Sequence, residues 1–100
     1  QKSTISLSKN MILVSYDITD DKLRTKFAKF LMKSGGIRLQ YSLYEFNNST
    51  RMLNNVRESI TNEFSKKFTP DDSVVIFTAS NENVEKFGNA IHRDKDLLVF

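Results

Sequence analysis

Two stretches of the chain are apolar on both of their alternating faces, which is typical of strands buried on both sides of a sheet. They are residues 11–18, "MILVSYDI", and residues 73–79, "SVVIFTA". We expect both to be central strands. Between them, residues 37–46, "IRLQYSLYEF", alternate as a strand, but the apolar phase slips to Tyr44 and Phe46. A bulge, or a break into two short strands, would explain the slip.

Two other segments repeat apolar residues at helical spacing. The first should begin at an N-cap within residues 19–21, "TDD", and end at the glycine pair 35–36. Its apolar stripe consists of Leu23, Phe27, Phe30 and Leu31. The second should follow the turn "NNST" and run to about Lys67. Its stripe consists of Leu53, Val56, Ile60 and Phe64.

The two ends of the chain differ in character. Residues 1–10, "QKSTISLSKN", are polar and without period, so we interpret them as a tail before one domain that spans residues 11–100. Residues 81–93 are ambiguous, because their apolar spacing suggests a short helix that Gly88 would weaken. The terminal "LLVF" is too apolar to be left in water, and we expect it to be a strand that pairs with another segment.

Composition narrows the class of protein. A chain of 100 residues with 39% hydrophobic residues fits one small folded domain. No apolar run approaches the roughly 20 residues that span a bilayer, so we expect a soluble, cytoplasmic protein without a membrane partner. The absence of cysteine excludes disulfides, thiolate nucleophiles and cysteine-zinc sites. The formal net charge of +3 is a mild indication of anionic partners.

The order β-α-β(β)-α-β-β predicts an α+β fold in which an antiparallel sheet carries both helices on one face. Two helices with single apolar stripes cannot cover both faces of the sheet, although two strands look buried on both. The economical cover for the second face is another copy of the chain, in a two-fold dimer. Asp17 lies in phase with Leu13 and Ser15, so on an uncovered face it would approach its own symmetry mate.

The first helix also carries a basic stripe opposite its apolar one. The stripe consists of Lys22, Lys26, Lys29 and Lys33 and has no acidic partner beyond its first turn. A solvated lysine face is the commoner interpretation for a single helix. In a dimer, however, two such stripes would suit the two-fold backbone of a duplex.

Three motifs in order carry a resemblance to a known family: "YDI" closing the first strand, "DDKLRTK" opening the first helix, and "GIRLQYSLYE" in the next strand. Residues 11–100 resemble the CRISPR-associated protein two family, the small dimeric adaptation subunits. The resemblance implies a ferredoxin-like dimer that serves spacer acquisition as a double-stranded DNA scaffold. Its partner would be the integrase, CRISPR-associated protein one. Members of the family are also assigned metal-dependent cleavage of RNA or DNA.

The resemblance also assigns residues. Asp17 matches the first-strand aspartate, which would bind Mg²⁺ together with Asp17 of the second subunit and serve as the catalytic carboxylate of a nuclease. The alternative is that Asp17 only begins the turn into the helix. Arg24 and Arg38 match family arginines and would contact nucleic acid with the lysine stripe, although Leu23 stands where relatives are often basic. The terminal strand would cross to the partner at the dimer interface through Leu97, Leu98, Val99 and Phe100.

Three functions therefore compete: a non-catalytic DNA scaffold, a magnesium-dependent endonuclease, and a toxin-type ribonuclease on a similar dimer. The scaffold is favoured, because one family-matched carboxylate per subunit and no nearby histidine make a poor set of catalytic groups beside a basic surface. Whether the protein is an enzyme stays open at this point.

Overall fold

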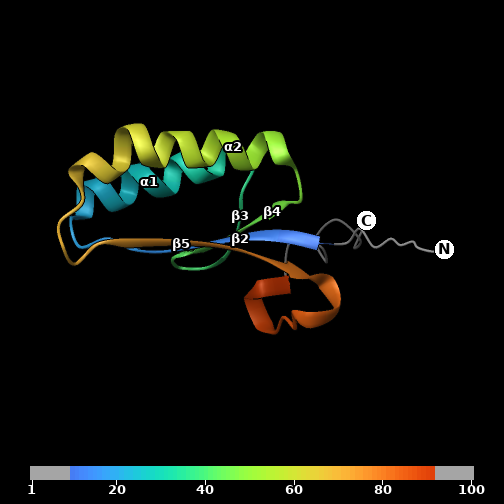
Figure 1. The fold of residues 1–100 in the computed structure, drawn as a ribbon. Helices are drawn as coiled ribbons and strands as arrows, with labels where there is room; N and C mark the ends of the chain where they lie inside the picture. The colour runs from blue at the N-terminus through green and yellow to red at the C-terminus, as the bar shows by residue number, and fades with distance from the viewer. Residues whose placement is uncertain (1–9, 92–100) are drawn as a thin grey trace.

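The computed structural model describes residues 10–91, and its elements follow β-α-β-β-α-β order (Figure 1). The strands and α-helices are β2 (Asn10–Asp17), α1 (Asp21–Lys33), β3 (Ile37–Gln40), β4 (Leu43–Asn47), α2 (Thr50–Ser59) and β5 (Ser73–Ser80). Helix α2 continues through a π-helical turn, Ile60–Phe64, and a 3-10 turn, Ser65–Lys67. The predicted terminal strand and most of the predicted tail lie outside the described residues.

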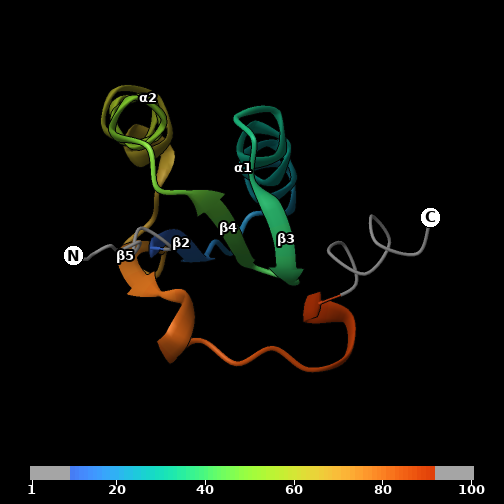
Figure 2. The ribbon, with the colours of Figure 1, turned by 90° about the vertical axis from the view of Figure 1, so that its right-hand side faces the viewer.

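The strands form one sheet in the order β3-β4-β2-β5, and every neighbouring pair is antiparallel. Both helices lie on one face of this sheet, and the segment after β5 lies on the other (Figure 2). The predicted ferredoxin-like α+β arrangement is thereby confirmed. The predicted slip within residues 37–46 is also confirmed, because the chain breaks into β3 and β4 and the register shifts between Arg38 and Gln40.

The main core lies between the sheet and the helices. Its central ring is Phe27 of α1, which is 0% exposed. That ring meets Tyr16 of β2 edge-on at 5.0 Å between centroids and Phe64 at 4.9 Å. One aromatic side chain therefore links α1 to the central strand and to the end of the second helix.

The helix ends follow the expected capping chemistry. The Asp20 carboxylate accepts a hydrogen bond of 2.8 Å from the Leu23 N–H, and Ser49 caps α2 in the same way through the Met52 N–H. After α1, Gly36 allows a close approach to β4. A Cβ atom there would lie 2.7 Å from Phe46 Cζ and 2.9 Å from the Leu31 carbonyl oxygen.

The opposite face is covered in part by the chain itself. Residues 81–91, which we call the return segment, run back across the sheet after β5 (Figure 2). Val84 and Ala90 of this segment pack against a small cluster formed by Met11, Leu13 and Leu39. A half-buried ion pair, with Lys86 Nζ 2.6 Å from Glu45 Oε1, ties the segment to β4. The short helix suggested for this region is wrong, because the segment contains only two 3-10 turns, Asn81–Asn83 and Gly88–Ile91.

The prediction that β5 is a second central strand is wrong for the described part of the sheet, where β5 is an edge. The return segment covers only part of β5, and Val75 and Phe77 of this strand are 54% and 43% exposed. By contrast, the first strand is central as expected, with Met11, Ile12, Leu13 and Val14 all buried. The apolar residues on both faces of β5 indicated that both faces would be buried. They did not indicate which segment would bury them.

Within residues 10–91, no helix is both long enough and apolar enough to span a bilayer.

Candidate nucleic-acid interface

Helix α1 presents its lysine stripe to solvent. Lys22, Lys26, Lys29 and Lys33 are all exposed, on the side of the helix away from Phe27 and Leu31. Three of them border an open depression of ≈ 380 Å³ together with Asp21 and Thr25. A row of this kind can contact successive phosphates through charge alone.

The expectation that the stripe has no acidic partner beyond its first turn is wrong at one position. Lys26 Nζ lies 3.5 Å from Glu63 Oε2 in the turn that follows α2. Both side chains are about half exposed, so the pair holds Lys26 only weakly. The sequence could not show this partner, because helical periodicity places residues within one helix and not between neighbours.

Arg24 is bound to its own subunit rather than directed into solvent. Its Nη1 donates to the carbonyl oxygens of Ile18, at 3.0 Å, and Thr19, at 3.4 Å, while Nη2 forms an ion pair with Asp21. Asp21, and after it the Tyr41 hydroxyl, raise the pKa of Arg24 above its usual value. Arg24 therefore fixes the turn between β2 and α1 while keeping its charge, a role that the predicted DNA contact did not include.

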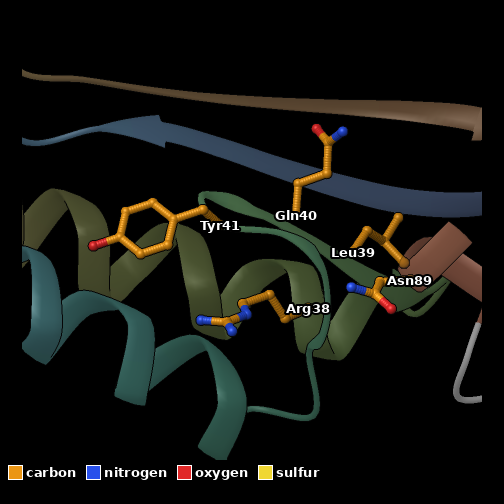
Figure 3. Close-up of a pocket in the computed structure, with 5 residues that line it drawn as sticks. All are labelled: Arg38, Leu39, Gln40, Tyr41 and Asn89. Atoms are coloured by element: carbon orange, nitrogen blue, oxygen red, sulfur yellow. The ribbon is translucent and has the colours of Figure 1, made fainter.

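Arg38 lies on the exposed side of the β3 irregularity. Figure 3 shows its side chain extending toward the helix layer, whereas Gln40 points the opposite way. Together with Leu39, Gln40, Tyr41 and Asn89, it lines a pocket of ≈ 320 Å³ between the β3–β4 hairpin and the return segment. Of the two predicted arginine contacts, Arg38 is the one presented at the surface.

Asp17 ends β2 on the face away from the helices and is exposed. Its register partner is Ser73, which supplies no carboxylate. Among residues 10–91, no three side chains of histidine, cysteine, aspartate or glutamate gather in a way that would hold a metal ion. Asp17 therefore belongs to no such group of three in one chain, and a carboxylate alone does not make a metal site.

A carboxylate that sequence reasoning passed over organises the same end of the molecule. Asp72 Oδ1 accepts hydrogen bonds from the Thr19 N–H at 2.9 Å and the Thr19 hydroxyl at 3.0 Å. Its other oxygen accepts from the Thr69 N–H at 2.8 Å. These bonds, with that of Thr69 as the largest cause, lower the pKa of Asp72. The turn sequence "TPDD", residues 69–72, was the available signal, because proline and aspartate favour turns, but it does not show which groups Asp72 binds.

We expect Asp72→Asn to lower the melting temperature at pH 7 and to flatten its fall in acid. The folded-state pKa lies below the unfolded value of about 3.9, so the carboxylate stabilises the fold above that value. This contribution is lost as the pH falls through the folded-state pKa. Thermal melts by circular dichroism from about pH 2.5 to pH 7 would measure it. The exposed neighbour Asp71, changed to asparagine, serves as the control, and an equal effect in both variants would contradict the assignment.

Two tyrosines lie beneath the hairpin edge of the site. Tyr16 and Tyr44 stack with ring centroids 6.2 Å apart, and the Tyr16 hydroxyl donates to the Tyr41 carbonyl oxygen at 3.4 Å. Burial first, and the nearby Tyr44 hydroxyl second, raise the pKa of Tyr16 to about 12. The Tyr44 hydroxyl is buried and has no partner in hydrogen-bonding geometry among the described residues. Placement in phase on a strand favours core or dimer packing for Tyr41, Tyr44 and Phe46; Tyr44 and Phe46 are in the core, whereas Tyr41 is not.

Tyr41, the third aromatic of this strand region, is 69% exposed at the tip of the hairpin. The predicted interface residues Leu97 to Phe100 lie outside the described residues.

A sequence model of the family described as CRISPR associated protein Cas2 matches residues 10–87. Among solved structures, the chain is similar to the hypothetical protein TT1823 from Thermus thermophilus, with 32% sequence identity, a TM-score of 0.65, and coverage of 80% of this chain and 92% of that chain. It is also similar to a crystal structure of cas2, with 22% identity, a TM-score of 0.60, and coverage of 79% and 84%. No curated protein matches at a significant level.

Proposed function

The chain belongs to the CRISPR associated protein Cas2 family, and from this premise we propose that it serves CRISPR adaptation as a dimeric scaffold that binds double-stranded DNA. Membership of the family supports a role in a CRISPR system. The finer assignment depends on one observation, the row of four exposed lysines along α1. In the proposed complex, the dimer bridges copies of the integrase, CRISPR-associated protein one.

The chemistry of this surface favours recognition of backbone charge. Lysine is a compact cation on a flexible stem, so it attracts phosphate without the fixed fork that reads base edges. The stripe is spaced along one helix face, which suits contacts along a backbone rather than insertion into a groove. We therefore expect binding that depends on salt and hardly on sequence.

A dimer is supported by the uncovered end of the sheet. Val75 and Phe77 are exposed neighbours on one face of β5, and the outer edge of β5 is unpaired in the described sheet. An exposed apolar edge strand of this kind needs a partner to avoid nonspecific pairing. A second copy placed there would double the number of lysines available to one duplex.

The nuclease alternative requires a metal, and the described residues of one chain do not fit one. Asp17 belongs to no group of three potential ligands among them, so another copy, water or substrate phosphate would have to complete the set. We derive no chemical step through Mg²⁺, and the scaffold needs none.

The test measures duplex affinity by fluorescence anisotropy over a range of salt concentrations. Lys22 and Lys33 are changed together to glutamine, and the matched control changes Lys66 and Lys67, two exposed lysines beyond α2. In a dimer the first variant loses four phosphate contacts, so the slope of log affinity against log salt should shrink by about 2 to 4. The control variant should keep the wild-type slope.

Asp17→Ala completes the experiment, with Mg²⁺ or a chelator present and with labelled DNA and RNA. The scaffold predicts that this variant binds duplex as the wild type does and that neither protein cleaves. Mg²⁺-dependent cleavage lost only in Asp17→Ala would instead assign a nuclease. RNA cleavage that survives the change and the chelator would favour the toxin-type ribonuclease.

A further inference from the structure

We propose that a pocket between α1 and the β3–β4 hairpin binds a phosphate monoester, either at the 5′ end of a nucleic acid or on a free mononucleotide. If the phosphate is the 5′ end of a nucleic acid, the inference rests on the proposed function. The pocket has a volume of ≈ 220 Å³. Its lining includes three basic side chains and three tyrosines: Arg24, Lys29, Arg38, Tyr16, Tyr41 and Tyr44.

The charge of the lining selects an anion. Arg24, Lys29 and Arg38 supply three cations, and no carboxylate lines the pocket. The ion pair with Asp21 offsets part of the Arg24 charge and leaves an excess of positive charge. Because the Arg24 donors are already bound to two backbone carbonyl oxygens and to Asp21, Arg38 is the guanidinium that would form paired, charge-assisted hydrogen bonds with the phosphate.

The floor of the pocket is formed by Tyr44, which is 0% exposed. Its buried hydroxyl lies beside the Tyr16 hydroxyl, whose pKa it raises, and is not open to the pocket. The cations of the lining would therefore hold the ligand, and the tyrosine floor limits how deeply it can enter.

The shape of the pocket favours a terminal phosphate over a phosphate within a continuous nucleic-acid backbone. Thr25, Ala28 and Met32 of α1 form one wall, the hairpin forms the other, and Tyr44 closes the floor. A phosphodiester must leave such a site in two directions, whereas a terminal phosphate leaves in one. A monoester also carries about −1.5 to −2 charges at pH 7, which matches three cations better than the single charge of a diester.

The available space agrees with that ligand. At roughly 30 Å³ for each water, the pocket has room for several water molecules, enough for a phosphate and part of its sugar. Arg38 and Tyr41 line the pocket from the hairpin, so the Arg38 guanidinium can approach a ligand from that side.

The experiment compares two duplexes of one sequence that differ only in 5′-phosphate or 5′-hydroxyl ends. We expect the wild type to bind the phosphorylated duplex about tenfold more tightly, as one or two charged hydrogen bonds would give. Arg38→Gln should bring the ratio of the two affinities close to one. Lys33→Gln, on the stripe but outside the pocket, should weaken both duplexes and leave the ratio unchanged.

Lys29→Gln is a second test of the pocket. Lys29 is exposed on α1 and lines the pocket, so the melting temperature should not change. The preference for the phosphorylated duplex should nevertheless fall several-fold. An unchanged preference in a variant with an unchanged melting temperature would count against the proposal.

A second arm titrates adenosine 5′-monophosphate, against adenosine, into the wild type and Arg38→Gln and follows amide shifts by NMR. Shifts around the pocket that require both the phosphate and Arg38, without any preference between the duplexes, would identify a free mononucleotide as the ligand. If these shifts occurred but neither duplex bound, the proposed function would be wrong, whereas the pocket would still be a site for a phosphate monoester. Equal duplex affinities and no response to the monophosphate would overturn the inference.

Discussion

Phe27→Ala is expected to lower the free energy of unfolding by about 3–5 kcal/mol, because it removes a fully buried ring from the junction of three elements. Phe27 is 0% exposed and lies 5.0 Å from the Tyr16 ring and 4.9 Å from the Phe64 ring, between centroids. The cavity would open between α1, β2 and the turn after α2. Because the surrounding structure relaxes only partially around such a cavity, most of the lost packing would not be recovered.

Urea denaturation followed by circular dichroism at 222 nm would measure the change. Phe87→Ala is the matched control, because Phe87 is 77% exposed on the return segment and its loss should change stability by less than about 0.5 kcal/mol. If Phe27→Ala cost less than about 1 kcal/mol, the aromatic junction would not be the centre of the core.

A loss of this size would also affect function, because the total stability of a domain is only about 5–15 kcal/mol. Phe27 lies on the face of α1 opposite the lysine stripe. The ring that packs α1 against the sheet therefore also fixes the position of the lysines. Loosening α1 would also separate Arg24 from the turn that it fixes. A change in the core would therefore weaken nucleic-acid binding without touching a binding residue.

The sequence was most informative where neighbours in space are also neighbours along the chain. Helix α1 follows from its apolar spacing, from the cap at Asp20 and from the glycines after it. The split of residues 37–46 into β3 and β4 follows from a slip in alternation. Each of these signals comes from residues close together in the sequence. The packing of those residues in the folded structure agrees with the element that the signal predicts.

The errors concern which segments meet. The double-sided apolar pattern of β5 suggested a central strand, but the same pattern results when the return segment covers one end and leaves Val75 and Phe77 open. Likewise, nothing within α1 could reveal that Lys26 faces Glu63. Long-range pairs depend on the fold, which alternation and spacing do not encode pair by pair.

The candidate site shows the same division. The motifs located Asp17, Arg24 and Arg38, but not what each one touches, and Arg24 proved to hold a turn. Asp72 and the Tyr44 hydroxyl carried no motif, since their importance comes from partners gained or missing in three dimensions.

The combined change of Val75 and Phe77 to aspartate is expected to convert a dimer into a monomer at micromolar concentration. Both side chains are exposed in the single chain, at 54% and 43%, so the fold itself should tolerate the change. In the proposed dimer, the carboxylates would be buried against a second copy without partners, which costs several kcal/mol. Analytical ultracentrifugation would measure the mass, and an unchanged melting temperature at low concentration would confirm that the monomer is folded.

Loss of the dimer should also weaken binding to a long duplex by about a hundredfold or more, because the second subunit no longer contributes its stripe to the same DNA. The slope of log affinity against log salt should fall to about half. Phe87→Asp is the control, since Phe87 is exposed and apolar but lies on the return segment rather than on β5. If the Val75 and Phe77 variant stayed dimeric, the uncovered end of the sheet would not be the interface. If it became monomeric yet kept the full salt slope, one subunit would carry every phosphate contact, and the two-stripe scaffold would be wrong.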